Sequence, residues 1–270
     1  MLLLALQCCS GDMQQALNLA ALIGEIEPKT RGDVEFAILH NRSVKGWMAE
    51  AIVAATEGKF VKTHIIKSKR FGIGWPDGCN DLWQDGMMQI AELYAKGTIS
   101  SHAVLTFEPD CLMLRPDWIN ALIAEWNLVS SNGKHCFGHI HDAGGTIGNH
   151  INGNAVFRTD MVKRYAKMQT SATAWDCEHK DITLSVGVDS DLILQQYGRR
   201  TEINREEILT IRKNGKVPAF VHGIKHQSGI EAVREMIKDG SFHSNGHSKF
   251  PKDSGSRQEV SELPISGCVK

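Results

Sequence analysis

The sequence predicts an α/β fold in which helices flank a mixed, mostly parallel sheet. Over the first 66 residues, apolar runs alternate with stretches of helical periodicity in the order strand, helix, strand, helix, strand. This order is typical of parallel strands joined by crossover helices. Polar or glycine-rich residues follow the predicted strands, and the composition, with 42% apolar and 23% charged residues, is that of an ordinary globular protein.

The first half of the chain holds the most regular segments. Its opening residues, MLLLALQCC, are read as a buried strand rather than a signal peptide, because the apolar run is short and no basic residue precedes it. Strands are expected at residues 1–6, 33–39, 59–66 and 103–107. Helices are expected at 13–27, 43–56 and 81–96, with a loop rich in glycine and proline at 70–80.

The second half is less regular. Helices are expected at 117–125 and 159–168, with Asp117 and Thr159 as their N-caps, and a further helix at 190–196. Strands are expected at 152–157 and 219–221. Residues 130–150 are rich in Gly, His and Asn, so this stretch is expected to hold short strands at most.

Length, charge and cysteine content limit the class of protein. The 270 residues suit one domain at 1–240, built from halves at 1–110 and 111–240, and a polar, flexible tail at 241–270. A net charge of −1 gives no general attraction to nucleic acid or a membrane surface, and no apolar run approaches the roughly 20 residues that span a bilayer. Seven scattered cysteines without a CxxC pair indicate a reduced, cytoplasmic protein.

Two carboxylates follow the predicted strand at 103–107, in the tripeptide Glu108-Pro109-Asp110. Carboxylates at a strand end suit Mg²⁺ or Mn²⁺, which take oxygen ligands and also bind phosphate oxygens. Pro109 stiffens the turn and removes a backbone donor. A pair of solvated carboxylates at a strand end is the alternative interpretation.

Polar groups also follow the other parallel strands. In an open parallel sheet, ligands bind beyond the carboxyl ends of the strands. Those ends carry Gln7, Cys8 and Cys9 after the first strand, Asn41 after the second and Arg70 after the third. We therefore expect a ligand site at this edge of the sheet.

Several further stretches, in this order, resemble the nucleotide-sugar glycosyltransferases of the GT-A fold. They are GWPDGCN at 74–80, HINGNA at 150–155, AWD at 174–176 and FVHGIK at 220–225. Glu108-Pro109-Asp110 stands where that family has its D-x-D motif, with Glu in place of the first Asp. The resemblance covers about residues 1–230 and implies a Rossmann-like, nucleotide-binding half at 1–110 and an acceptor half at 111–240. The chain is also similar to phage-encoded glycosyltransferases of this pattern.

The resemblance implies a role for each candidate residue. Mn²⁺ or Mg²⁺ is expected on Asp110, with Glu108 in support and His222 as third ligand. A general base that deprotonates the acceptor is expected at Asp176. The expected pocket for the donor sugar and acceptor consists of Asn152, Gly153, Asn154 and Trp175. The expected contacts to the nucleotide sugar are Gln7, Cys8, Cys9, Asn41, Arg70, Trp75, Asn80 and Lys225.

Each of these residues also has a plainer interpretation. His222 is equally a structural hydrogen-bonding residue, Trp75 a core residue and Asp176 a helix N-cap. Cys8 and Cys9 suit packing as small apolar side chains, and Asn152-Gly153 suits a turn. His135, His139 and His141 lie close together in sequence, which leaves a zinc site open as a further alternative.

The expected activity is transfer of a sugar from a nucleoside diphosphate, preferably UDP, to a hydroxyl group. The phage-type resemblance points to a hydroxymethylated pyrimidine in DNA as acceptor, which must leave the base stack to reach a cleft. A glycan or protein acceptor, a non-catalytic nucleotide-sugar-binding protein and a nucleotidyltransferase are the alternatives, and stereochemistry and oligomeric state stay open. The basic residues expected to follow DNA phosphates are Lys163, Arg164, Lys167, Arg199, Arg200, Arg212, Lys213 and Lys216.

Overall fold

A computed structural model of the chain describes residues 1–27, 29–145, 148–161, 173–195, 202–213 and 217–244. In these ranges the first half runs β1 (Leu2–Cys8), α1 (Met13–Ile26), β2 (Arg31–His40), α2 (Gly46–Ala55), β3 (Phe60–Lys67), α3 (Asp77–Ala95) and β4 (Ala103–Phe107). The second half runs β5 (Cys111–Met113), α4 (Trp118–Ser131), β6 (Cys136–Asp142), β7 (Asn149–Arg158), α6 (Trp175–Glu178), α7 (Lys180–Val186), β8 (Gly187–Asp189), β9 (Ile193–Gln195), α8 (Arg205–Lys213), β10 (Phe220–His222), α9 (Ser228–Lys238) and α10 (Ser241–Ser244).

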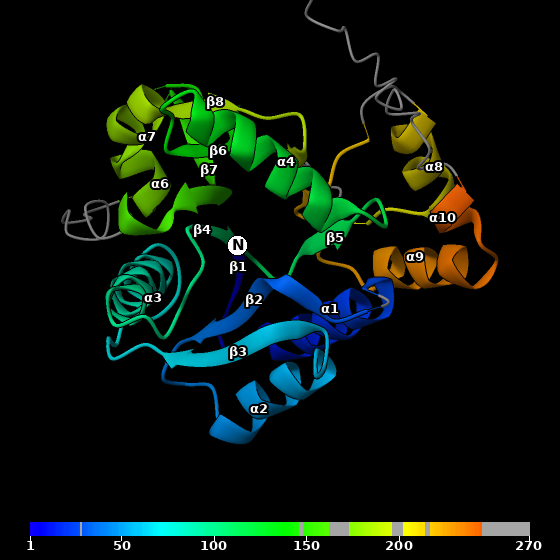
Figure 1. Ribbon diagram of the computed structural model, residues 1–270, viewed down its shortest axis with the longest axis horizontal. Helices are drawn as coiled ribbons and strands as arrows, with labels where there is room; N and C mark the ends of the chain where they lie inside the picture. The colour runs from blue at the N-terminus through cyan, green and yellow to red at the C-terminus, as the bar shows by residue number, and fades with distance from the viewer. Residues whose placement is uncertain (28, 146–147, 162–172, 196–201, 214–216, 245–270) are drawn as a thin grey trace, which may run out of the picture.

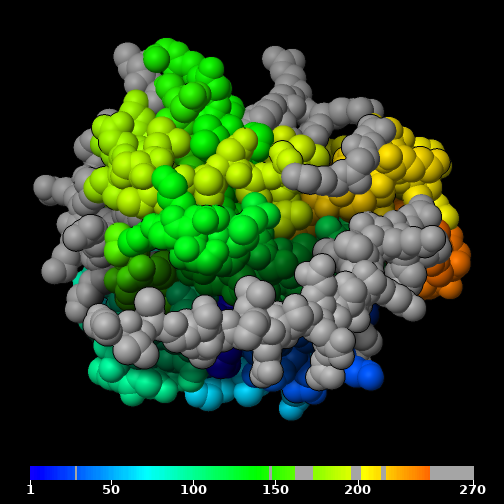
Figure 2. All heavy atoms as spheres, turned by 45° about the horizontal axis from the view of Figure 1, so that its top comes forward, coloured from blue at the N-terminus to red at the C-terminus, as the bar shows by residue number. Residues whose placement is uncertain are grey.

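A seven-stranded sheet in the order β3-β2-β1-β4-β7-β6-β8 forms the centre of the molecule (Figure 1). Strands β3, β2, β1 and β4 are parallel, whereas β7 runs antiparallel to both β4 and β6. A second sheet, in the order β5-β10-β9, has three strands. The mixed, mostly parallel sheet expected from the sequence is therefore confirmed. The space-filling view shows the second half of the chain, in green to yellow, gathered above the blue and cyan first half (Figure 2).

Helices cover both faces of the large sheet because its central strands are apolar on both sides. Leu2, Leu4 and Leu6 of β1 belong to the core under α1, α2 and α4, whereas Leu3 and Ala5 belong to the core under α3. Successive side chains of a strand point to opposite faces, so a continuous apolar run such as LLLAL serves two layers of helices. This double burial explains why the opening residues form a strand.

Three predicted segments differ in the structure. Residues 193–195 of the predicted helix 190–196 form β9, because Ile193 and its neighbours pair with β10. Residues 130–150 hold the seven-residue strand β6, whose buried Cys136 and Phe137 pair with β7. Helix α3 begins at Asp77, inside the expected loop, next to the turn-forming Pro76.

Further differences concern helix ends and the C-terminal part. Asp117 stands at the start of α4, but its carboxylate binds the Arg115 guanidinium instead of capping the helix. Helices α8 and α9 were not predicted. Phe242 in α10 is fully buried, so packed structure continues past the expected start of the tail at 241. Residues 162–168 of one predicted helix and 245–270 of the tail lie outside the described residues.

Glu35 is the fully buried carboxylate that ties β2 to the segment before β4. Its Oε2 accepts hydrogen bonds from the backbone N–H groups of Ser100 and Ser101, both at 3.0 Å, and from the Ser101 hydroxyl at 2.6 Å. We expect Glu35→Ala to lower the free energy of unfolding by about 3 kcal/mol, because these buried donors lose their acceptor. Urea unfolding measures this. Glu50→Ala, at an exposed site, is the control and should change stability by less than about 0.5 kcal/mol.

Candidate active site

A cavity of about 830 Å³ opens at the carboxyl ends of β1, β2 and β4. This is the position expected for a ligand site in an open parallel sheet. The predicted residues that line it are Gln7, Cys8, Cys9, Asn41, Arg70, Trp75, Glu108, Asp110, Trp175 and Lys225. These residues come from segments far apart in the sequence, and the sheet brings them together.

The two predicted carboxylates and the predicted histidine meet at one side of this cavity. His222 Nε2 lies 2.9 Å from Glu108 Oε2 and 3.0 Å from Asp110 Oδ1. Strand register produces this meeting, since His222 of β10 is paired with Cys111 of β5, directly after Asp110. The backbone carbonyl of Asp110 also accepts hydrogen bonds from the N–H groups of Gly223 and Ile224, at 3.0 and 2.8 Å.

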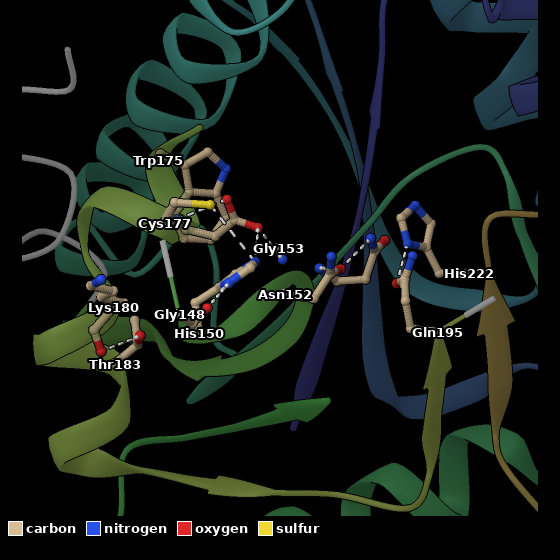
Figure 3. A network of polar contacts seen from close by, with 12 residues as sticks. Gly148, His150, Asn152, Gly153, Trp175, Cys177, Lys180, Thr183, Gln195 and His222 are labelled. Atoms are coloured by element: carbon tan, nitrogen blue, oxygen red, sulfur yellow. Dashed lines mark hydrogen bonds and ion pairs between the residues drawn. The ribbon is translucent and has the colours of Figure 1, made fainter. Parts of the chain in front are cut away.

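A second contact orients the His222 ring. Its Nδ1 lies 2.6 Å from Gln195 Oε1, so Nδ1–H donates to the amide oxygen (Figure 3). Nε2 therefore faces the two carboxylates. Gln195 was not predicted as a site residue, because residues 190–196 were expected to be helical. As the last residue of β9, Gln195 is paired with His222 across the ladder.

The charges of Glu108 and Asp110 favour a positive charge on His222. Burial lowers the pKa of His222, but hydrogen bonds and charge from Asp110 and Glu108 outweigh it and raise that pKa to about 10. Burial raises the pKa of Asp110, yet the hydrogen bond and charge of His222 leave it below its usual value. Asp110 Oδ1 is buried, and its described partner is the His222 ring nitrogen at 3.0 Å. The group therefore holds two carboxylates around one charged imidazolium.

Three asparagines predicted to contact sugar form hydrogen bonds with backbone groups near the cavity. Asn154, 1% exposed, accepts the Glu108 N–H through Oδ1 at 2.8 Å, and Asn152 Oδ1 accepts the N–H of Asn154 at 3.0 Å. Asn80 donates to the carbonyl of Thr173 at 2.9 Å and accepts the N–H of Trp175 at 2.8 Å. None of the three lines the cavity, so their described contacts are supporting ones.

Trp175 and Asp176 begin helix α6 beside the cavity. The Trp175 ring stacks on Trp83 with 3.6 Å between centroids. Asp176 Oδ2 accepts the N–H of Gly153 at 3.0 Å, and its Oδ1 accepts the N–H of Cys177 at 3.0 Å. Gly153 suits this close approach, because a Cβ there would lie 3.1 Å from the Trp175 ring. Burial raises the pKa of Asp176, which increases its ability to accept a proton near neutral pH.

The rim of the cavity carries exposed apolar side chains. Phe71, Ile73 and Trp75 are 73%, 91% and 72% exposed, and the Arg42 guanidinium lies 3.9 Å from the Phe71 ring centroid. Trp75 is therefore not a core residue. Arg70 lies against the cavity wall with Nη1 3.2 Å from Asp81 Oδ1.

Asp12 is a cavity-lining carboxylate that sequence reasoning missed as a site residue. Its position just after β1, in Gly11-Asp12, was the available signal. Burial raises its pKa from 3.8 to about 6, although the Cys9 N–H donates to it at 2.6 Å. Folding therefore disfavours the charged form of the Asp12 carboxyl group.

Asp12→Asn should therefore stabilise the protein in a pH-dependent way. The raised pKa means that folding favours protonated Asp12, so its stability contribution is present below about pH 4 and is lost as pH rises through about 6. We expect the variant to gain about 2 kcal/mol at pH 8 and close to nothing at pH 4. Thermal unfolding at both pH values measures this, with the exposed Asp77→Asn as control. An equal gain at both pH values would contradict the assignment.

The structure also bears on the alternative zinc site and on the predicted DNA-binding surface. No metal-capable group in the described part of the chain includes His135, His139 or His141. Arg212, expected to contact DNA phosphates, is buried, and its Nη2 donates to the Phe242 carbonyl at 2.6 Å. Lys213 is exposed. The remaining basic residues of that predicted surface, Lys163, Arg164, Lys167, Arg199, Arg200 and Lys216, lie outside the described residues.

The described residues also bear on membrane insertion and on disulfides. No helix among them is both long and apolar enough to cross a bilayer. The cysteines among them, Cys8, Cys9, Cys79, Cys111, Cys136 and Cys177, are all free thiols.

Comparisons with known proteins find a likeness in structure. No protein-family model matches the chain, and no curated protein matches its sequence. The bifunctional glycosyltransferase WbbM is 12% identical over 90% of this chain with a TM-score of 0.51, and the match covers 51% of WbbM, so the chain spans about half its length. An active-site mutant of LgtC is 12% identical with a TM-score of 0.52 (88% of this chain, 95% of LgtC).

A third solved structure agrees with these two. Mouse xyloside xylosyltransferase 1 is 9% identical with a TM-score of 0.51, and the match covers 83% of this chain and 98% of that enzyme. At these identities the likeness establishes the fold. The arrangement of seven mostly parallel strands between helices agrees with it, and the chain therefore has the GT-A glycosyltransferase fold that its sequence predicted.

Proposed function

We propose that this protein is a metal-dependent glycosyltransferase that moves a sugar from a nucleoside diphosphate, preferably UDP, to a hydroxyl acceptor. The observation that carries the proposal is the meeting of Glu108, Asp110 and His222 beside a large cavity at the carboxyl edge of the sheet. The similarity in fold to LgtC, one structure of which is described as a complex with donor and acceptor sugar analogues, supports it.

The residues present fit Mn²⁺ or Mg²⁺. Two carboxylates and one imidazole offer ligand atoms within 4.8 Å of one another, and Asp110 Oδ1 is buried with only the His222 nitrogen as its described partner. When bound, the cation would neutralise charge on the departing diphosphate. Asp110, His222 and Glu108 would hold it, in place of the proton that His222 otherwise shares with both carboxylates.

The other cavity residues divide between the two parts of the donor. Lys225 and Arg70 add positive charge where the diphosphate leaves. Gln7, Cys9 and Asn41 line the cavity at the ends of β1 and β2, and we propose that they contact base and ribose. Cys8 is buried and its thiol points at Met13 Sδ, 3.6 Å away, so its contribution is through the backbone or packing.

Asp176 is the proposed base. In an inverting transfer, the bond between the anomeric carbon and the diphosphate oxygen breaks as the acceptor oxygen bonds to that carbon, and Asp176 takes the hydroxyl proton. Its two backbone hydrogen bonds fix the carboxylate, and the preceding residue, Trp175, lines the cavity. Retention of configuration would not require this role.

For the acceptor we propose a hydroxymethylated pyrimidine in DNA, as expected for a phage-encoded enzyme working in the host cytoplasm. The exposed faces of Phe71 and Trp75 at the cavity mouth support it, because extrahelical bases stack on such side chains. Sugar rings also stack on aromatic faces, so a glycan acceptor is the second candidate.

The test is release of free nucleoside diphosphate from UDP-, GDP- and dTDP-sugars with Mn²⁺. Each reaction is run alone, with DNA containing hydroxymethylated pyrimidines and with a glycan mixture. Release stimulated by that DNA, and absent with unmodified DNA, is expected. Stimulation by glycans alone would keep the transferase and overturn the acceptor. Donor binding with no release under any condition would identify a non-catalytic nucleotide-sugar-binding protein.

A further inference from the structure

A second group of potential metal ligands lies beside Asp176, apart from the Glu108 group. His150 Nε2 is 3.8 Å from Cys177 Sγ and 3.9 Å from Asp176 Oδ2. The ligand atoms of all three side chains lie within 4.8 Å of one another, and His150 and Asp176 are buried. The side chains come from β7 and α6, two elements that pack directly against each other.

Backbone contacts fix the orientation of two of these side chains, and Figure 3 shows the contact of His150 with Gly148. His150 Nδ1 lies 3.4 Å from the carbonyl of Gly148, so Nδ1–H points at that oxygen and the lone pair of Nε2 faces Cys177 and Asp176. A histidine that binds a metal through one nitrogen ordinarily donates its other N–H in this way. The Asp176 carboxylate is held on both oxygens, by the N–H groups of Gly153 and Cys177.

The spacing of the three atoms suits a small tetrahedral ion. Ligands bound to one zinc ion at about 2.0–2.3 Å lie about 3.3–3.7 Å from one another. The two separations from His150, 3.8 and 3.9 Å, therefore need to close by only a few tenths of an ångström, and the ligand atoms of Cys177 and Asp176 lie within 4.8 Å of each other. A thiol, an imidazole and a carboxylate together form a donor set typical of Zn²⁺, whereas Mg²⁺ and Mn²⁺ prefer oxygen ligands.

We propose that Cys177, His150 and Asp176 form a binding site for Zn²⁺ or a similar thiophilic divalent cation. Binding forms bonds from the cation to sulfur, nitrogen and oxygen, and the Cys177 thiol releases its proton to solvent. The thiolate and the Asp176 carboxylate together balance the two positive charges, which suits a largely buried position. The Glu108 group has two carboxylates and no sulfur, so we assign Mn²⁺ or Mg²⁺ to it.

The site gives a direct means of regulation, which rests on the proposed function of Asp176. A cation bound to Asp176 occupies the carboxylate that would accept the acceptor proton. We therefore expect Zn²⁺ to inhibit sugar transfer in the presence of excess Mn²⁺. Loss of the thiolate, in Cys177→Ser, should weaken that inhibition at least 10-fold, since the sulfur is the ligand that selects zinc over manganese.

Binding is tested with Co²⁺ as an optical probe for the zinc position. The Asp110→Asn variant is used as the background, so that the Glu108 group contributes little. A thiolate bound to Co²⁺ gives a charge-transfer absorption band in the near ultraviolet, which Zn²⁺ should abolish by displacement. We expect this band in the background protein and in Cys79→Ser, whose thiol also lies beside the cavity. The band should be lost in Cys177→Ser and strongly weakened in His150→Gln.

A second measurement uses the protein without substitutions. Zn²⁺ should protect Cys177 from alkylation by iodoacetamide, read by mass spectrometry, and leave the exposed Cys79 as reactive as before. A missing cobalt band, a band that survives in Cys177→Ser, or unprotected Cys177 would each overturn the site. These readouts do not depend on activity, so failure of the proposed transferase would leave them interpretable. Bound Zn²⁺ without inhibition of an active enzyme would overturn the regulatory role.

Discussion

Asp110→Asn should reduce metal-dependent release of nucleoside diphosphate by at least about 10³-fold. Asp110 is the more buried of the two carboxylates that face His222, because 13% of its side chain is exposed, compared with 45% for Glu108. An amide keeps the shape of the side chain but removes the charge that a divalent cation requires, and with it the stabilisation of the leaving diphosphate. The measurement is initial rate against Mn²⁺ concentration with the best donor from the panel.

The control for this prediction is Asp117→Asn. That carboxylate also lies just after the metal motif, but it does not line the cavity. Its Oδ1 accepts a hydrogen bond from Arg115 Nε at 2.6 Å, and its Oδ2 accepts one from Arg115 Nη2 at 2.8 Å. It should keep its metal-dependent activity. Both variants should unfold near the native temperature, which thermal unfolding measures. In Asp110→Asn the backbone carbonyl of residue 110 still accepts hydrogen bonds from Gly223 and Ile224. An Asp110→Asn protein with full activity would contradict the assignment of the metal site.

Asp176→Asn should lower kcat by about 10²–10⁴-fold and leave the affinity for the nucleotide sugar within a few-fold of the original. The amide oxygen still accepts one of the two backbone N–H groups, so the position of Trp175 is largely kept. The proton acceptor is lost, however, and the chemical step slows. Steady-state kinetics for transfer, with separate measurement of donor binding, distinguishes these effects.

The pH profile adds a second readout for Asp176. Because burial raises its pKa, the rate of the native enzyme should rise with pH through that raised pKa, as the base loses its proton. This rise should be absent from the residual activity of Asp176→Asn. Asp181→Asn, on the neighbouring helix α7, is the matched control and should retain the native profile. An unchanged kcat in Asp176→Asn would favour a retaining mechanism.

The large sheet and the position of the Glu108 and Asp110 carboxylates could both be predicted from the sequence, for one physical reason. Apolar runs define strands, and polar residues that follow parallel strands meet at one edge. Gln7, Asn41 and Asp110 could therefore be placed together before any coordinates were known. His222 was reached through the family resemblance, and the pairing of β10 with β5 explains how it arrives beside Asp110.

The supporting residues were harder to predict because their side chains serve several purposes. An asparagine that donates and accepts hydrogen bonds suits a sugar hydroxyl as well as a backbone, and Asn80 and Asn154 bind backbone. Gln195 was missed because a three-residue strand is too short to show a periodicity that distinguishes it from a helix. The grouping of His150 with Cys177 depends on the contact between β7 and α6, which no local pattern encodes.

The placement of His222 also has a consequence for the synthesis of the protein. Glu108 and His222 are separated by 114 positions in the chain, with Glu108 between β4 and β5 and His222 at the end of β10. A ribosome makes the large sheet's central strands and both carboxylates long before it makes the histidine, and domains begin to fold as they emerge. The nascent chain can thus form most of its core while the site still lacks one ligand. Catalytic competence would arrive late in translation, when β10 inserts between β5 and β9.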